Sequence, residues 1–281
     1  MTILDTHLHV IDRGRLAYPW LAGVPALDHD FSYDVYAREA RRVGITDVLH
    51  MEVDVAEDDI GREIEMVAGL QARPDSLVRG AIAACRPESP EFPAFLEAAR
   101  ANPVVKGFRR VLHVVPDDVS EGAVFRDNIA RLAGTGLPFD VVVRADQIPK
   151  AIALADAAPN VQFVLDHCGV PAVKDRAEHP WREHVAEIAR RPNVAAKISG
   201  VIAYADPAGW TLADLRPFVE HVIGAFGWHR VVWGSDWPVV TLGGTLSTWV
   251  AATHALIAGC SEHERTALLH RNARRIWNLP A

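Results

Sequence analysis

Two histidines one residue apart, His7 and His9, stand in the stretch DTHLHVID. The apolar residues around them predict a strand, in which alternate side chains share a face, so Asp5 lies in the same register as both imidazoles. Imidazoles one pleat apart converge on a single metal ion or on an oxyanion. The alternative is that these histidines only hydrogen-bond in the core or at the surface. The opposite, helix-facing side of this strand is predicted to carry Leu4, Thr6 and Leu8.

Two further polar residues close predicted strands. His167 stands in VLDHCG on the face of Phe163 and Leu165, and Asp236 stands in VVWGSDWPV. An acid at the mouth of an apolar strand is costly to bury unless it is paired or liganded, so Asp236 is a candidate catalytic group. The alternative is that Asp236 caps the next helix. Asp166 has the opposite parity to His167, and we predict a structural acceptor or a helix cap there.

Basic residues lie inside two other predicted strands. Lys197, in NVAAKISG, must point at a counter-charge or at water, which leaves pairing with Asp140 or Asp236 and contact with substrate as alternatives. In VVKGFRRVLH, Gly107 suits the crowded interior of a sheet, so Arg109 on the same face is predicted to point inward. Weaker candidates on neighbouring strands are His50, Glu52, Asp140 and Arg144.

The elements that must position these residues alternate along the whole chain, with short apolar runs followed by longer amphipathic ones. The predicted strands are Ile3–His9, Thr46–Val53, Leu77–Ala83, Val104–Arg109, Pro138–Arg144, Val161–His167, Val194–Ser199 and Val231–Asp236. The predicted helices are Tyr33–Val43, Asp59–Ala72, Pro93–Arg100, Gly122–Leu132, Gln147–Ala157, Trp181–Arg190, Leu212–Phe226, Thr245–Ala258 and Ser261–Trp277. Eight βα alternations predict a parallel (β/α)8 TIM barrel, an α/β fold with one domain over residues 1–281, whose candidate residues meet at the carboxyl ends of the strands.

A doubly wound open sheet is the alternative topology. It would be expected to carry a glycine-rich phosphate turn after a strand. The sequence contains neither GxGxxG nor GxxxxGK[ST]. We therefore predict that the protein uses no nucleotide cofactor.

Composition narrows the range of partners. The 281 residues are 49% hydrophobic and 23% charged, with a net charge of −7 and no basic tail, so nucleic acid is not an expected partner. No apolar run approaches the roughly 18 residues of a membrane helix. The three cysteines are widely spaced, which favours a reducing compartment. We expect no signal peptide and a cytoplasmic protein, because the first predicted strand starts almost at Met1.

In this order, DTHLHVID, YPWL, KGFR, DHCG, KISG and GSDWPV resemble the amidohydrolase superfamily over essentially the whole chain. More narrowly, the chain resembles the sugar-lactonase branch, which includes L-fuconolactonase and L-rhamnonolactonase. The resemblance implies a TIM barrel that hydrolyses the ester of a small-molecule sugar-acid lactone. It also implies a catalytic set made of His7, His9, His167 and Asp236, with Lys197 and Arg109 as polar binders of substrate.

One departure from the superfamily pattern bears on the metal. Binuclear members carry a bridging lysine or glutamate on strand four and a further histidine at the end of strand five. The fifth strand here ends in Val-Val-Val-Arg144, and Lys106 has the wrong parity to share a site with Arg109. We therefore expect one divalent metal, with Zn²⁺ first among candidates, or none.

The expected mechanism starts from Asp236 as general base on a water molecule poised over the lactone carbonyl. His7, His9 and His167 either ligate one metal ion, with Asp236 or water as a further ligand, or donate hydrogen bonds directly to the carbonyl oxygen. Substrate-binding side chains are also expected in the loops. They are Trp20 and Trp237, although each is equally compatible with loop packing, and Arg144 at the end of the fifth predicted strand is a further candidate for binding substrate.

Two points stay open in the sequence. The same histidines and aspartate would serve a mononuclear zinc decarboxylase or hydratase acting on an aromatic or unsaturated carboxylic acid. The oligomeric state is also open, a homo-oligomer included.

Overall fold

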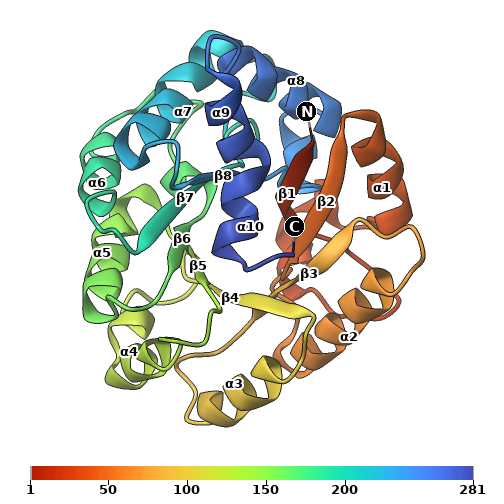
Figure 1. Cartoon of the computed structure of the whole chain (residues 1–281), viewed down its shortest axis with the longest axis vertical. Coiled ribbons are helices and arrows are strands. Elements are labelled where there is room, and N and C mark those ends of the chain that lie inside the picture. Colours follow the sequence, from red (N-terminus) through yellow and green to blue (C-terminus); the bar gives the residue numbers. More distant parts are fainter. Residues whose placement is uncertain (1, 281) are drawn as a thin grey trace.

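The computed structural model describes residues 2–280, in which eight parallel strands pair in chain order. A bridge between Leu8 and Trp237 joins the segment after the last strand to the first, so the ring is nearly closed (Figure 1). The strands are β1 (Ile3–Leu8), β2 (Ile45–Met51), β3 (Val78–Ala84), β4 (Val105–Val111), β5 (Phe139–Val142), β6 (Phe163–Leu165), β7 (Val194–Ile198) and β8 (Val231–Trp233). The predicted TIM barrel is confirmed.

Helices surround this ring on its outer side (Figure 1). They are α1 (Tyr33–Arg42), α2 (Ile60–Gln71), α3 (Phe92–Arg100), α4 (Ala123–Ala130), α5 (Ile148–Ala157), α6 (Trp181–Ile188), α7 (Leu212–Phe226) and α8 (Leu246–Leu256). In β4, Phe108 packs outward on Phe92 and Phe95, with ring centroids 6.4 and 5.8 Å apart. The neighbouring Arg109 therefore faces inward, as predicted. Within residues 2–280, no helix is both long enough and apolar enough to cross a membrane.

The C-terminal segment crosses one end of the barrel (Figure 1). In place of the single predicted helix, it consists of α9 (Glu262–Thr266), a π-helical segment (Ala267–Arg271) and α10 (Asn272–Ile276). The amide of Asn272 donates to the carbonyl oxygen of Val231 at the start of β8, and Asn278 donates to that of Gly136 ahead of β5. This segment, residues 262–279, therefore closes the amino-terminal end, and we call it the plug.

Plug and barrel share a compact apolar cluster, separate from the larger core under the helices. Its members are Leu4, Leu49, Met51, Ile82, Val164, Ala195, Val232, Ala273, Ile276, Trp277 and Leu279. Because these strand residues lie inside the barrel, the cluster also shows which face of each strand points inward.

Strand β1 departs from the predicted alternation. Leu4 belongs to the interior cluster, whereas the carboxylate of Asp5 accepts a hydrogen bond of 2.6 Å from the Tyr36 hydroxyl of α1. The predicted faces of these two residues are therefore wrong. The pairing of β1 with β2 shifts register between Asp5 and Leu8, and such an irregularity reverses the faces on one side of it. Beyond it, His7 points inward and Leu8 outward, as predicted.

Six strands end earlier than predicted, among them β5 at Val142, β6 at Leu165 and β8 at Trp233. Beyond two of these ends, His167 and Asp236 have φ values of 52° and 59°, a left-handed conformation that non-glycine residues rarely adopt. Side chains alternate between the two faces only along a regular strand. The odd or even position of a residue that follows the end of a strand therefore does not show whether its side chain points into the barrel. Such strained residues concentrate at functional sites.

Candidate active site

The carboxyl end of the barrel brings His7, His9 and Asp236 together. The Nε2 atoms of the two histidines lie 3.1 Å apart, and Oδ1 of Asp236 lies 3.6 Å from Nε2 of His7 and 3.5 Å from Nε2 of His9. All three residues are buried. The pair that the sequence places one pleat apart on β1 therefore meets the acid that follows β8.

His167 joins this group from the other side of His7, with the two ring centroids 4.5 Å apart. Its Nδ1 lies 3.0 Å from the Ser199 hydroxyl and 3.7 Å from Oδ2 of Asp236. Its predicted face is wrong, because Phe163 and Leu165 pack in the outer core. The side chain reaches the interior because the backbone turns at His167 itself.

Asp166 accepts a hydrogen bond from Arg109, as expected of the predicted structural acceptor. The predicted difference in face from the catalytic residues is wrong, because this carboxylate lies within the cluster. Its Oδ1 is 2.8 Å from Nζ of Lys197 and 3.8 Å from Nδ1 of His7, and its Oδ2 is 3.4 Å from Arg109. Asp166 continues the inward face of Val164, whose side chain belongs to the interior cluster.

Two buried cations bind these acids. Nε of Arg109 donates to Glu52 at 2.6 Å, and its Nη1 lies 3.3 Å from Nε2 of His7. Lys197 is fully buried and donates to Oδ1 of Asp140 at 2.6 Å. The predicted pairing of Lys197 with Asp140 is confirmed, and its other carboxylate partner is Asp166 rather than Asp236.

The protons on His7 and His9 follow from the chemistry of their partners. Lysine only donates, and Nζ of Lys197 lies 3.2 Å from Nδ1 of His7. A carbonyl only accepts, and Nδ1 of His9 lies 3.0 Å from the Met51 oxygen. With both rings neutral, His9 therefore carries its proton on Nδ1 and leaves Nε2 as an acceptor. His7 faces a donor on each side, because Nη1 of Arg109 lies 3.3 Å from its Nε2, so the ring accepts at one nitrogen and carries its proton on the other. With the proton on Nε2, Lys197 donates to His7 and His7 donates to His9, whereas an unprotonated Nε2 is free to bind a metal ion.

Burial sets the protonation of the cluster. It raises the pKa of Asp236 to about 6 and that of Asp140 to about 7. Burial and the charge of Lys197 hold the pKa of His7 well below its usual value, and burial with Arg109 lowers that of His9 to about 4. The two imidazoles are therefore neutral near pH 7, whereas Asp236 is mostly ionised.

The balance of charge within the cluster is negative. Arg109 and Lys197 pair with Glu52, Asp140 and Asp166, and a fourth carboxylate, Asp236, lies in the same cluster beside His7. With all four ionised and the histidines neutral, two negative charges remain in excess. Such an excess is relieved by protonation of carboxyls or by a divalent cation.

His7, His9 and Asp236 match the dimensions of a metal site. Ligands about 2.0–2.1 Å from a tetrahedral zinc ion lie about 3.3–3.4 Å from one another, and these three donors are 3.1–3.6 Å apart. His9 also has the usual second partner of a metal-bound histidine, since its other nitrogen faces a carbonyl oxygen. The residues fit one divalent ion. His167 belongs to a second possible group with His7 and Asp166.

The structure brings some predicted substrate-binding residues to other places. Trp237 is buried and packs on Phe31 and Tyr36, so the loop-packing alternative describes it. Trp20 is half-buried, and its indole N–H donates to the carbonyl oxygen beyond β2 at 2.8 Å. Arg144 lies past the end of β5, is exposed and pairs with Asp146 at 3.2 Å, outside the buried cluster.

Two loop residues near the cluster, Tyr204 and His113, are not predicted by the sequence pattern. Tyr204, after β7, packs edge-on against His167 with ring centroids 6.2 Å apart. His113, after β4, has a buried Nδ1 without a hydrogen-bond partner in the described structure, and burial followed by the charge of Arg109 lowers its pKa. Neither residue lies on a strand, so no periodicity pointed to it.

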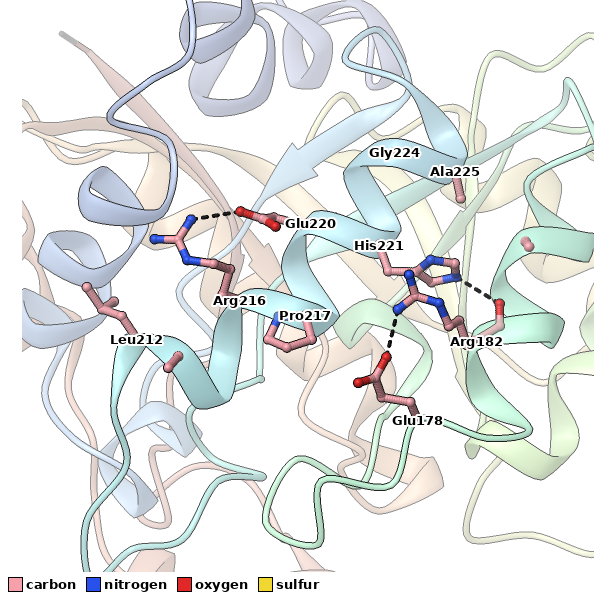
Figure 2. Close-up of a pocket in the computed structure, with 11 residues that line it drawn as sticks. Glu178, Arg182, Leu212, Arg216, Pro217, Glu220, His221, Gly224 and Ala225 are labelled. Atoms are coloured by element: carbon pink, nitrogen blue, oxygen red, sulfur yellow. Dashed lines mark hydrogen bonds and ion pairs between the residues drawn. The ribbon is translucent and has the colours of Figure 1, made fainter.

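A wide surface hollow of about 970 Å³ lies on the outer side, between α6 and α7 (Figure 2). Arg182 pairs with Glu178 and Arg216 with Glu220, both at 2.7 Å, and small residues line much of the rest. These charges are paired and partly exposed, unlike those of the buried cluster. We place the candidate active site at the carboxyl end of the barrel.

The family model described as "Amidohydrolase" matches residues 4–279 of the chain. The chain belongs to the amidohydrolase family. An L-fucono-1,5-lactonase from Burkholderia multivorans is 27% identical to this amidohydrolase, and the alignment covers 99% of this chain and 96% of the lactonase.

Solved structures agree with the fold. An amidohydrolase from Burkholderia multivorans with bound Zn has a TM-score of 0.89 at 25% identity, over 100% of both chains. A 2,6-dihydroxybenzoate decarboxylase from Rhizobium has a TM-score of 0.69 over 99% of both chains, and its 14% identity shows a shared fold alone. The predicted membership of the superfamily is confirmed.

Proposed function

We propose that this amidohydrolase hydrolyses the ester bond of a sugar-acid lactone, either an aldono-1,4-lactone or an aldono-1,5-lactone. The observation that carries the proposal is the buried Asp236 carboxylate beside three imidazoles at the carboxyl end of the barrel. The name of the Burkholderia multivorans relative supports a lactone as the substrate class.

In the proposed reaction, Asp236 accepts a proton from water as the water oxygen bonds to the lactone carbonyl carbon. A pKa of about 6 leaves this carboxylate ionised at neutral pH and stronger as a base than an ordinary aspartate. The ring C–O bond then breaks, and Asp236 returns the proton to the departing ring oxygen. The product is the open hydroxy acid.

The developing oxyanion needs donors that are in place before the reaction. The neutral His7 is fixed between Lys197 and His9, and the guanidinium of Arg109 lies beside it. We assign oxyanion stabilisation to His7 and His167 as hydrogen-bond donors, with Arg109 supplying positive charge. His9 holds its proton toward the Met51 carbonyl, so it would act on the oxyanion through the divalent ion that it could hold. Lys197 is fully buried, so we assign it to the support of His7 rather than to contact with substrate.

His7, His9 and Asp236 are the residues that would hold one divalent ion. When bound, such an ion lowers the pKa of a coordinated water and polarises the carbonyl. The assignments of Asp236 and of the buried support residues do not depend on it.

One panel tests the proposal. Purified protein is offered aldono-1,4- and 1,5-lactones in a pH-indicator assay, with 2,6-dihydroxybenzoate in a parallel assay for CO₂ release and metal content measured on the same sample. We expect acid release far above the spontaneous rate for at least one lactone, and none from heat-denatured protein. No acid release from any lactone would overturn the proposal, and CO₂ release without lactone hydrolysis would replace it with a decarboxylase.

A further inference from the structure

Lys197 stands where the charged cluster meets the plug. Above it are Asp140 at 2.6 Å, Asp166 at 2.8 Å and Nδ1 of His7 at 3.2 Å. Below it is the indole of Trp277, with the ammonium nitrogen 5.5 Å from the ring centroid. Trp277 is only 1% exposed, so this contact lies in a region shielded from solvent.

The indole of Trp277 lies against Gly107 of β4, where the strand has no side chain. A Cβ added at Gly107 would lie 3.3 Å from Nε1 of Trp277 and 2.9 Å from the Pro138 carbonyl oxygen, so a side chain at this position would crowd the ring. Nε1 is buried and has no hydrogen-bond partner in the described structure. A smaller apolar side chain would avoid the cost of that orphan donor, which indicates that the ring itself serves a purpose.

An aromatic face attracts an ammonium, and tryptophan does so most strongly. Here the attraction acts from the side opposite His7. Because Nζ of Lys197 lies 3.2 Å from Nδ1 of His7, and Nε2 of His7 lies 3.1 Å from Nε2 of His9, the position of the ammonium sets the position of both imidazoles at the reacting end. Movement of Lys197 toward the plug would withdraw the partner of Nδ1.

We propose that Trp277 is a positioning residue for catalysis, which acts through Lys197 on His7 from the amino-terminal end of the barrel. This inference rests on the proposed hydrolytic function for its kinetic readout. Ile276 and Leu279 belong to the same plug and have no such contact with Lys197 in the described residues, so the role is particular to the indole.

Site-specific fluorination tests the proposal with little change in shape. Tryptophan carrying one to four ring fluorines is incorporated at position 277 alone, which progressively weakens the attraction for a cation. Since Nε1 donates no hydrogen bond, its changed acidity is not a competing cause. We expect kcat to fall stepwise, by about threefold to thirtyfold at four fluorines, with KM within twofold.

Trp233 supplies the control, because it is equally buried but stacks on Trp249 with ring centroids 6.4 Å apart. Its indole N–H donates to the Thr253 hydroxyl at 2.9 Å, so an effect of changed acidity would act at Trp233 and not at Trp277. The same fluorine series at Trp233 should leave kcat within twofold. A flat kcat series at Trp277, or parallel losses at both positions, would overturn the proposal.

Measuring the melting temperature tests the contact between Trp277 and Lys197 without depending on the proposed hydrolytic function. In the Lys197→Met background, fluorination at Trp277 should no longer lower the melting temperature, whereas it does so in the otherwise unaltered chain. Equal shifts in both backgrounds would overturn the proposal even if no lactone is hydrolysed. If Lys197→Met does not fold, a larger fall in melting temperature for the Trp277 series than for the Trp233 series in the parent chain supports it, and an equal or smaller fall overturns it.

Discussion

The two ends of the barrel interior are built from the same strands and hold opposite kinds of side chain. At the amino-terminal end, Leu4 and Val232 pack against Trp277 of the plug in an apolar cluster. At the carboxyl end, three and four residues further along these strands, His7 and Asp236 belong to a cluster of buried charges. Apolar burial stabilises the fold, whereas buried charge is retained at a cost. The comparison assigns stability to one end and chemistry to the other.

The largest expected effect tests the carboxyl end. Asp236→Asn removes the proposed base, and kcat for lactone hydrolysis should fall by about 10²- to 10⁴-fold. The free energy of unfolding should stay the same or rise, because burial disfavours this carboxylate. Steady-state kinetics and denaturant titration measure the two quantities. The matched control is Asp156→Asn on α5, an exposed partner of Arg191, and equal losses in both variants would contradict the assignment.

A substitution at the amino-terminal end of the barrel should lower stability and leave activity nearly unchanged. Leu279→Ala truncates a buried plug residue, so the free energy of unfolding should fall by about 2–5 kcal/mol. Because Leu279 does not contact the charged cluster, kcat measured well below the melting temperature should change by less than twofold. A loss of activity comparable to that of Asp236→Asn would break the division between the two ends.

A bound metal ion would stabilise the folded chain through the carboxyl end of the barrel, where the charged cluster lies, and not through the apolar end. At a free Zn²⁺ concentration one hundred times its Kd, folding should be stabilised by about 2.7 kcal/mol. The rise in melting temperature should disappear in His9→Ala, which removes one of three donors, and persist in Leu279→Ala. An equal rise in all three proteins would place the ion elsewhere.

The pH dependence tests the proposed base without a substitution. Asp236 acts only when ionised, so kcat/KM of metal-depleted protein should fall about tenfold per unit as the pH drops below about 6. The raised pKa has the opposite effect on stability, because the folded chain holds this proton more tightly than the unfolded chain. The contribution of Asp236 to stability is therefore full below pH 4 and is lost as the pH rises through 6. Rates that are constant from pH 5 to 7 would contradict the role of Asp236.

The smallest effect is expected in the hollow between α6 and α7. Arg216→Gln breaks a partly exposed ion pair with Glu220 and should change the free energy of unfolding by less than about 0.5 kcal/mol. The kinetic constants for lactones should be unchanged. A loss of more than tenfold in kcat/KM would show that chemistry is not confined to the carboxyl end.

The barrel could be predicted from the sequence, because eight alternating strands and helices are typical of this architecture. The sequence also identified Arg109 correctly, since Gly107 and Phe108 fix the faces of β4. The inward or outward direction of several side chains was predicted wrongly from their odd or even positions in a strand. The register shift in β1 exchanged Leu4 and Asp5. At β6 the wrong face was taken as the inward one, because Val164 and Asp166 point inward, and His167 reaches the interior only through the turn of its own backbone.

Other parts of the site lie outside the reach of periodicity. Tyr204 and His113 belong to loops, whose side-chain directions follow no repeat. Trp237 is in the expected loop, but only the packing around Phe31 and Tyr36 shows that its ring turns into the core. The role of Trp277 depends on a contact between residues 80 positions apart in the chain, which no local pattern encodes.

The contact between Leu4 and the plug has a consequence for the order of folding. The interior cluster joins the first strand to the last helix, so its closure requires contacts across nearly the whole chain. Such distant contacts form late and slowly, because the entropy of a long loop must be lost first. We therefore expect the strands that carry the imidazoles to remain incompletely anchored during synthesis, until the plug has left the ribosome. The barrel would then acquire catalytic competence only after the plug has been made and has packed against the first strand.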